Sequence, residues 1–301
     1  MKKDFKKPQK KILSPYWVTG IVDAEGNFSI NKQKYGHNYK FTFSFKVTQK
    51  EHSLGILHDL KNFFNCGHIH IDNRKENAYK YNIARLEDIF NIIIPHFDKY
   101  PLLTSKNLDF LDFKKAVYLL KNKLDLYENE ILSIKNNMNS KRSYAERWNF
   151  YESKKIILNP EWLQAFIDGE GCFQFNIVNT INRKKLYTAY MPTLSISQSS
   201  HSVKILKAII DFLGIGYLKP KYDITNMEIA KLTKVNRCIF NKNTEIIKFI
   251  DKYPMYTRKH LDYLAWKELI KLKKDNKHNT PEGRLLIEQI KNSMNRGRKD
   301  K

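Results

Sequence analysis

This chain contains the segment Ser14-Pro-Tyr-Trp-Val-Thr-Gly-Ile-Val-Asp-Ala-Glu-Gly26 and, further along, a second version of it. The second version reads Asn159-Pro-Glu-Trp-Leu-Gln-Ala-Phe-Ile-Asp-Gly-Glu-Gly171, and Pro, Trp, Asp, Glu and the final Gly recur in register. Ser14 and Asn159 are good helix N-caps, and a proline is favoured directly after the cap. Each version therefore predicts a helix of about three turns that stops at its terminal glycine.

The repeat continues beyond this segment. Asp98-Lys-Tyr-Pro returns as Asp251-Lys-Tyr-Pro, and two further matches pair residues 47–53 with 196–202 and residues 134–142 with 290–298. The spacing is far too long for a solenoid array. We therefore expect two similar half-domains, at 12–142 and 158–301, joined by a linker at 143–157.

Composition points to a polyanionic partner. The 301 residues include 54 Lys plus Arg against 31 Asp plus Glu, for a formal charge of +23, which is typical of nucleic-acid binding. No apolar run approaches the roughly 18 residues of a membrane span, and residues 1–11 lack the apolar core of a signal peptide. Cys66, Cys172 and Cys238 lie far apart, without the spacing of metal ligands.

Strand-like alternation follows each helix. In residues 40–48, Phe41, Phe43, Phe45 and Val47 alternate with polar residues, so the apolar members are expected to face a core. The second half repeats the pattern more loosely, from Phe173 onward. Helices are expected at 52–64, 86–97 and 102–120. Each half thus reads α-β-β-α-β-β-α, an α+β unit whose antiparallel sheet has one apolar and one polar face.

Each repeated helix ends in an acidic pair. Small residues four apart, Gly20 with Ala24 and likewise 165 with 169, would let the two helices pack closely and form a central interface. Glu25 and Glu170 would then converge at helix C-termini, where a carboxylate costs about 0.3–1 kcal/mol. A divalent cation such as Mg²⁺ would offset that cost and activate water beside a phosphate.

Two alternatives stay open on the residues alone. A glutamate after the last turn of a helix can simply be solvated. Asp23 and Asp168 compete for the metal, or instead bond backbone groups nearby, and their spacing does not choose between these roles.

Val18-Thr-Gly-Ile-Val-Asp-Ala-Glu-Gly26 and its second version at 163–171 resemble the signature of the LAGLIDADG homing endonucleases, in the single-chain form with two motifs. The resemblance implies a Mg²⁺-dependent endodeoxyribonuclease, a phosphodiester hydrolase, with Mn²⁺ or Ca²⁺ as alternative occupants. It assigns the metal ligands to Glu25, Glu170 and the carbonyls of Ala24 and Gly169. It also assigns active-site water to Gln49 and Gln198, and basic catalytic roles to Lys106 and Lys259. The plainer alternative for both lysines is phosphate contact or solvation.

The same resemblance implies saddle-shaped sheets whose polar faces lie in the DNA major groove. The two faces differ in content, so the target is expected to be asymmetric. The expected DNA-binding residues are Asn27, Ser29, Asn31, Lys40, Thr42, Ser44, Lys46, Thr48, His68 and His70 in the first half, and Gln174, Asn176, Thr193, Ser195, Ser197, Lys219 and Lys221 in the second.

These expectations combine into one hypothesis. The chain acts as a monomer with internal pseudo-twofold symmetry that cuts one phosphodiester on each strand of double-stranded DNA, without a membrane partner. The rival hypotheses are an intron RNA maturase, with intron RNA as the partner, and a DNA-binding protein on the same fold that no longer cuts. The Lys-, Asn- and Ile-rich composition indicates an AT-rich genome, so a mitochondrial or other organellar, organelle-encoded protein without a transit peptide is expected.

Overall fold

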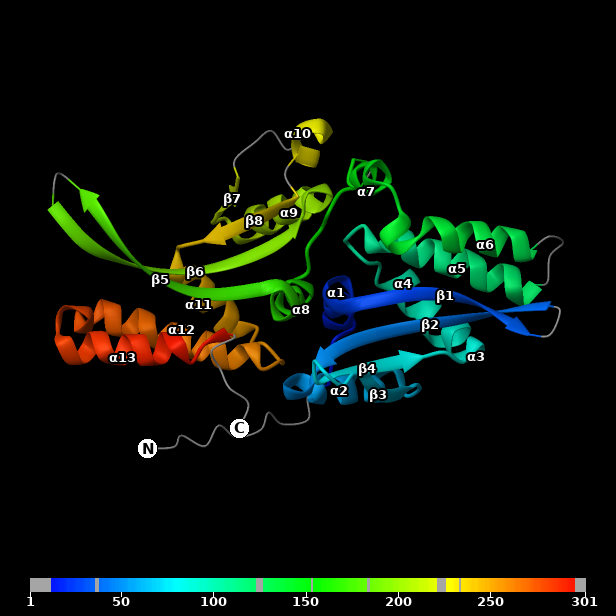
Figure 1. Ribbon diagram of the computed structural model, residues 1–301, viewed down its shortest axis with the longest axis horizontal. Coiled ribbons are helices and arrows are strands. Elements are labelled where there is room, and N and C mark those ends of the chain that lie inside the picture. The colour runs from blue at the N-terminus through cyan, green and yellow to red at the C-terminus, as the bar shows by residue number, and fades with distance from the viewer. Residues whose placement is uncertain are drawn as a thin grey trace. The chain divides into compact units, whose positions relative to one another are not determined.

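The computed structural model describes residues 12–35, 38–122, 127–152, 154–182, 185–220, 226–232 and 234–295, except for the side chains of 35, 38, 39, 180–182, 185 and 186. The chain divides into two compact units, Met1–Lys154 and Lys155–Lys301 (Figure 1). Lys221, one of the expected DNA-binding residues, lies outside the described residues.

The first unit begins with helix α1 (Pro15–Glu25) and strands β1 (Gly26–Tyr35) and β2 (Asn38–Lys50). A 3-10 turn η1 (Glu51–Ser53), α2 (Leu54–Phe64), β3 (His68–Asn73) and β4 (Ala78–Ile83) follow. The remaining elements are α3 (Leu86–Asp88), the π-helical turn η2 (Ile89–Ile93), α4 (Ile94–Lys99), α5 (Lys106–Asn122), α6 (Tyr127–Asn137), η3 (Asn139–Lys141) and α7 (Tyr144–Phe150). The four strands pair antiparallel in the order β1-β2-β4-β3.

The second unit repeats this plan. It contains α8 (Pro160–Glu170), β5 (Gly171–Asn182), β6 (Lys185–Ser199), η4 (Ser200–Ser202), α9 (Val203–Leu213), β7 (Tyr217–Lys219), α10 (Met227–Leu232) and β8 (Val235–Phe240). It closes with α11 (Asn243–Lys252), α12 (Lys259–Lys274), η5 (Lys277–Asn279) and α13 (Pro281–Asn292). Its antiparallel strand order is β5-β6-β8-β7, so the predicted α+β class and the duplicated halves are confirmed.

Each sheet is apolar on one face, where its own helices cover it. Phe28 is fully buried and its ring contacts those of Phe45, Phe97, Phe110 and Phe113 at centroid distances of 5.3–5.6 Å. In the second unit Phe173 packs in the same way against two aromatic residues of α12. Figure 1 shows α12 and α13 running along β5 and β6. The alternation read from the sequence is therefore the core pattern.

Two predicted boundaries differ from the structure. The helix expected at 102–120 starts only at Lys106, because the backbone amides of Leu103 and Thr104 bond to a side chain of α1 instead. The second difference lies in the expected linker at 143–157. Its residues 144–150 form α7, whose Trp148 is 3 % exposed, and the first compact unit extends to residue 154. The connection between the units is thus shorter than predicted.

Three additions were not expected. A π-helical turn interrupts the predicted helix at 86–97, helix α6 follows α5, and α10 lies between β7 and β8. Among the described helices, none is both long and apolar enough to cross a membrane.

Candidate active site

Each motif helix passes directly into a strand. The helices end at Glu25 and Glu170, and the next residue is the first of β1 or β5. The helices stop at these glycines as predicted, and Gly26, with φ −80° and ψ 158°, is extended rather than left-handed. Glycine is needed for space: a Cβ at position 26 would lie 2.5 Å from Cγ1 of Val22, and one at Gly171 would lie 2.6 Å from the carbonyl oxygen of Ile167. The strand can therefore begin without an intervening loop.

Asp23 and Asp168 are loop anchors. Asp23 is 4 % exposed and accepts hydrogen bonds from the amide of Leu103 (2.8 Å) and from the amide and hydroxyl of Thr104 (3.1 and 2.6 Å). Asp168 accepts the matching bonds from Tyr256 (2.7 Å) and Thr257 (3.2 and 2.7 Å). Burial raises the pKa of the Asp168 carboxyl, and these bonds oppose the shift. Both aspartates thus hold the loop after Tyr-Pro against their own helix.

In each unit, the loop held by this aspartate places a lysine side chain at the C-terminal end of the motif helix. Nζ of Lys106 donates to the carbonyl of Val22 at 2.8 Å, and Nζ of Lys259 donates to those of Ile167 (3.2 Å) and Gly169 (2.8 Å). The last carbonyls of a helix carry partial negative charge, so an ammonium group is stabilised there. One of these carbonyls belongs to Gly169, an expected metal ligand. Each unit therefore places a cation within one helical turn of its motif glutamate.

The glutamates are the accessible acids of the motif. Glu25 is exposed, and Glu170, Ala24 and Gly169 are half-buried. A carboxylate beside helix-terminal carbonyls is a set of hard oxygen donors that suits Mg²⁺. No group of three or more His, Cys, Asp or Glu able to hold an ion occurs within the described ranges. The residues thus fit an ion that keeps coordination positions for water and phosphate oxygens. The close pairing of the two motif helices stays a prediction.

Gln49 and Gln198 occupy matching positions. Gly26 pairs with Val47 and Gly171 pairs with Ile196, and each glutamine lies two residues beyond that partner. Both side chains are half-buried. Each glutamine thus stands near the start of the strand that leaves its motif, while its catalytic role stays a prediction.

The described members of the expected DNA-binding set lie on the strands β1, β2, β3, β5, β6 and β7. Most are half-buried or exposed on the face away from the core. Ser195 is different, because it is 3 % exposed and its hydroxyl is not open to a base edge here. In the first unit the hydroxyls of Ser29 and Ser44 lie 2.7 Å apart across the β1–β2 ladder. In the first unit these polar residues lie opposite one another on β1 and β2.

Three residues of this face were missed by the sequence reading. Lys80 and Asn82 on β4 lie between the partners Thr48 and Lys46 on one side and the histidines of β3 on the other. Arg237 on β8 lies between Ser197 and a lysine of β7, and its Nε donates to the hydroxyl of Ser197 at 3.1 Å. The available signal was the alternation within these strands, which is weak because each has only six residues.

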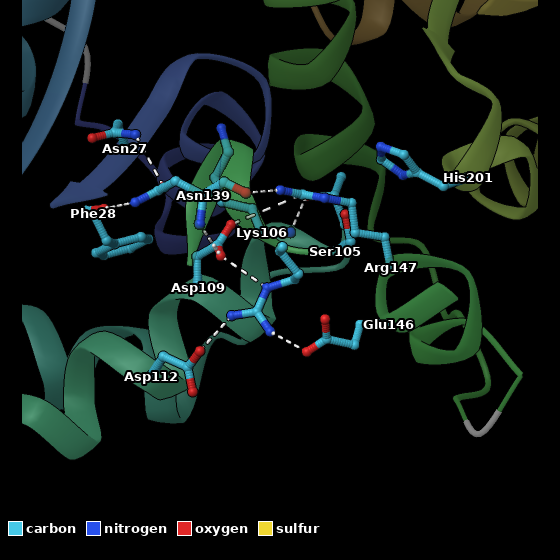
Figure 2. A network of polar contacts seen from close by, with 12 residues as sticks. Asn27, Phe28, Ser105, Lys106, Asp109, Asp112, Asn139, Glu146, Arg147 and His201 are labelled. Atoms are coloured by element: carbon cyan, nitrogen blue, oxygen red, sulfur yellow. Dashed lines mark hydrogen bonds and ion pairs between the residues drawn. The ribbon is translucent and has the colours of Figure 1, made fainter. Parts of the chain in front are cut away.

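A second repeated feature supports the strand after each motif (Figure 2). Asn139 has a φ of 56°, its Nδ2 donates to the carbonyl of Phe28 (2.9 Å), and its amide donates to Asp109 (2.8 Å). Nδ2 of Asn27, an expected DNA contact, donates to the Asn139 side chain at 3.3 Å. Asp109 also accepts from Nε of Arg142 at 3.0 Å, and both side chains are 5 % exposed.

The second unit contains the same clamp. Asn295, with a φ of 51°, donates through Nδ2 to the carbonyl of Phe173 (2.9 Å) and through its amide to Asp262 (3.0 Å). The repeat of residues 134–142 at 290–298 therefore has a structural role, because its asparagine holds the strand that follows the motif.

Comparison with known protein families agrees with this duplicated geometry. The family model described as LAGLIDADG endonuclease matches residues 18–117 and again 163–270. The chain belongs to the LAGLIDADG endonuclease family. Both matched segments begin inside a motif helix, so the duplicated sequence motif corresponds to the two repeats of this family.

LAGLIDADG relatives cover nearly the whole chain. Probable intron-encoded endonuclease 2 of Neurospora crassa is 30 % identical over 94 % of this chain and 65 % of its own length. Probable intron-encoded endonuclease Cox1-I1b of Schizosaccharomyces pombe is 28 % identical over 93 % of this chain and 70 % of its own length. The chain thus spans between about half and two thirds of several curated relatives, such as the 52 % of a second Neurospora protein.

Solved LAGLIDADG structures match over their full length. I-SmaMI bound to uncleaved DNA target in the presence of calcium ions has a TM-score of 0.79 and 27 % identity, covering 94 % of this chain and 99 % of that one. I-LtrWI bound to target DNA has a TM-score of 0.79 and 29 % identity, covering 94 % and 98 %.

Proposed function

We propose that this chain is a site-specific double-strand DNA endonuclease of the homing type that depends on a divalent metal, with Mg²⁺ as the working ion. The observation that carries the proposal is the duplicated junction of helix, glutamate and strand, with a lysine ammonium at each helix end. The DNA-bound state of the related I-SmaMI and I-LtrWI supports DNA as the substrate.

The roles of the residues follow from their positions in each unit. Glu25 and Glu170 hold the metal, aided by the carbonyls of Ala24 and Gly169. When bound, the ion lowers the pKa of water and stabilises the leaving oxygen of a phosphodiester. Asp23 and Asp168 keep the lysine-bearing loop in place, and each unit serves one strand.

One lysine and one glutamine lie near the motif glutamate in each unit, and both have a role in the proposed reaction. Lys106 and Lys259 supply positive charge next to the glutamates. This charge stabilises the negative charge that develops on the phosphate in the transition state. Gln49 and Gln198 orient water through their amide groups. Substitution of either lysine by Met should reduce the cleavage rate while specific binding is retained; unchanged cleavage by both variants would remove them from the mechanism.

Recognition is assigned to the non-core faces of the two sheets. Their Asn, Gln, Ser, Thr, Lys and Arg side chains are suited to base edges and phosphates of the major groove. The net charge of +23 supplies the attraction for the backbone. We further propose an organellar origin, because relatives are named intron-encoded, and one from Saccharomyces cerevisiae is named a mitochondrial protein.

The test uses Glu25→Gln and Glu170→Gln on a duplex selected from a randomised library in Mg²⁺. Both variants should lose double-strand cleavage and retain specific binding, because the amide removes the charge that holds the metal and preserves the shape. Glu282→Gln, at an exposed position in the first turn of α13, is the matched control and should cleave normally. Full cleavage by both single variants would refute the assignment.

A further inference from the structure

The two units carry different chemistry at matched positions of their non-core faces. In the first unit Asn31 pairs with Thr42, and Gln33 pairs with Lys40. The corresponding pairs of the second unit are Asn176 with Met191 and Val178 with Ala189. A polar or charged residue has thus been replaced by an apolar one at three of these four positions.

The apolar side chains of the second unit are open to solvent. Met191 is 44 % exposed and Val178 is 41 % exposed, although both lie on a sheet whose other face is buried. A separate apolar pair lies on β7 and β8, where Tyr217 (40 % exposed) pairs with Ile239 beside Ser195 of β6. The matched pair in the first unit is His68 with Asn82. Met191 and Val178 thus form a small apolar patch across the β5–β6 ladder, separated from Tyr217 and Ile239 by the polar Thr193 and Ser195 of β6.

If this face lies against DNA, an apolar group must meet Met191 and Val178 for their removal from water to favour binding. In the major groove of DNA, the apolar group presented by base pairs is the C5-methyl group of thymine. Asn176 lies directly across the ladder from Met191, and an asparagine can make two hydrogen bonds to adenine. One residue pair thus offers a donor and acceptor for adenine beside an apolar surface for a thymine methyl.

We propose that the second unit recognises its half of the DNA target through thymine methyl groups, which Met191 and Val178 contact beside Asn176. This inference rests on the proposed function. The first unit reads its half by hydrogen bonds and charge. Its face carries Lys40 and Lys46, which suit the acceptors of guanine. The half-site of the second unit is accordingly rich in A·T pairs.

The experiment replaces thymine by uracil, which removes the methyl group and leaves every hydrogen-bonding group of the base intact. A duplex is first selected by the unchanged protein from a randomised library. Affinity is then measured in Ca²⁺, the ion present with uncleaved target in the I-SmaMI structure. The thymines of the second unit's half-site that contact Met191 and Val178 should each weaken binding about fourfold when changed to uracil, the factor expected for one buried methyl group. The same change in the other half-site should have little effect.

Two variants assign the half-site and test the contact. Met191→Thr and Val178→Gln introduce the residues found at the matched positions of the first unit, Thr42 and Gln33. Library selection with each variant should change the preferred bases in one half-site only. In that half-site, the loss of affinity on changing thymine to uracil should disappear for Val178→Gln and shrink for Met191→Thr, whose threonine keeps one methyl group. Melting temperature and affinity for non-specific duplex verify that the variants stay folded.

The outcomes separate the two claims. Uracil sensitivity confined to one half-site and reduced or abolished by the variants supports the inference. If the preferred duplex bound equally well after thymine was replaced by uracil, the thymine-methyl inference would be overturned. The proposed endonuclease function would not be affected. Equal sensitivity in both half-sites, or a penalty unchanged by both variants, would also overturn it. If selection from the library yielded no preferred duplex, both the proposed site-specific endonuclease function and the thymine-methyl inference would be refuted.

Discussion

His96 lies in an aromatic cluster of the first unit and has a depressed pKa. Its ring contacts those of Phe63, Phe64 and Phe97 at centroid distances of 5.5, 5.2 and 4.7 Å, and that of Tyr100 at 5.5 Å. Among the described residues, its buried Nε2 has no hydrogen-bond partner. Burial lowers the pKa of His96 to about 4 from the ordinary value of 6.5, because the cation would lose its hydration.

This depressed pKa destabilises the first unit in acid. The unfolded state binds a proton near pH 6.5, whereas the folded state resists it down to about pH 4. Stability is therefore fully present above pH 6.5 and is lost progressively as the pH falls toward 4. Between pH 8 and pH 5 the contribution of His96 amounts to about 2 kcal/mol of unfolding free energy.

The residue at the matching position of the second unit is a suitable replacement for His96, because it cannot be protonated. The matched position is Phe249, whose ring lies 5.2 Å from that of Tyr253. His96→Phe should therefore fit, and its advantage over the native protein should grow by about 2 kcal/mol between pH 8 and pH 5. Urea denaturation followed by tryptophan fluorescence at a series of pH values measures the difference.

The control is His58→Gln, because His58 is exposed on α2 of the same unit. This variant should follow the native pH dependence. If the His96→Phe protein and the native protein lost the same free energy of unfolding on acidification, the reasoning from burial would be wrong.

Three further predictions concern the clamp, the motif junction and the charge. Arg142→Met should destabilise the first unit by about 3–5 kcal/mol in urea denaturation, since it leaves Asp109 buried and without its closest cation; a loss below 1 kcal/mol would contradict this. Gly171→Ala should cost about 1–3 kcal/mol through the clash with Ile167 and should reduce cleavage more than binding, because Glu170 shifts; a fully active variant would argue against the close contact. Affinity for duplex DNA should fall about a thousandfold between 50 and 200 mM salt; a flat salt titration would exclude extensive phosphate contact.

Some features followed directly from the sequence and others did not. The alternation around Phe43 placed the strand and its buried face, because side chains on a strand point to opposite sides at every second residue. The first residue of α5 could not be found in this way. Residues 102–105 are Leu-Leu-Thr-Ser, and the amides of Leu103 and Thr104 bond to Asp23, which comes from another part of the chain, instead of joining the helix.

The glycine after each motif was located from the sequence, but the reason that glycine is needed there came from the structure. A helix-ending glycine is most often left-handed, whereas Gly26 is extended and is needed because Val22 leaves no room for a Cβ. Arg237 and Lys80 were missed because strands of six residues carry too short a pattern to distinguish a polar face from a loop.

By itself, the sequence determined the duplication, the helix that ends in Asp-x-Glu-Gly, and the polar and apolar faces of the strands. All of these depend on residues that are near one another in the chain, so local patterns were enough. The tertiary structure alone decided which acid of each motif is engaged. Asp23 and Asp168 bond to amides about 80–90 residues away, and lysines from the same loops reach the helix ends. Such bonds depend on how distant segments pack, which no local pattern encodes.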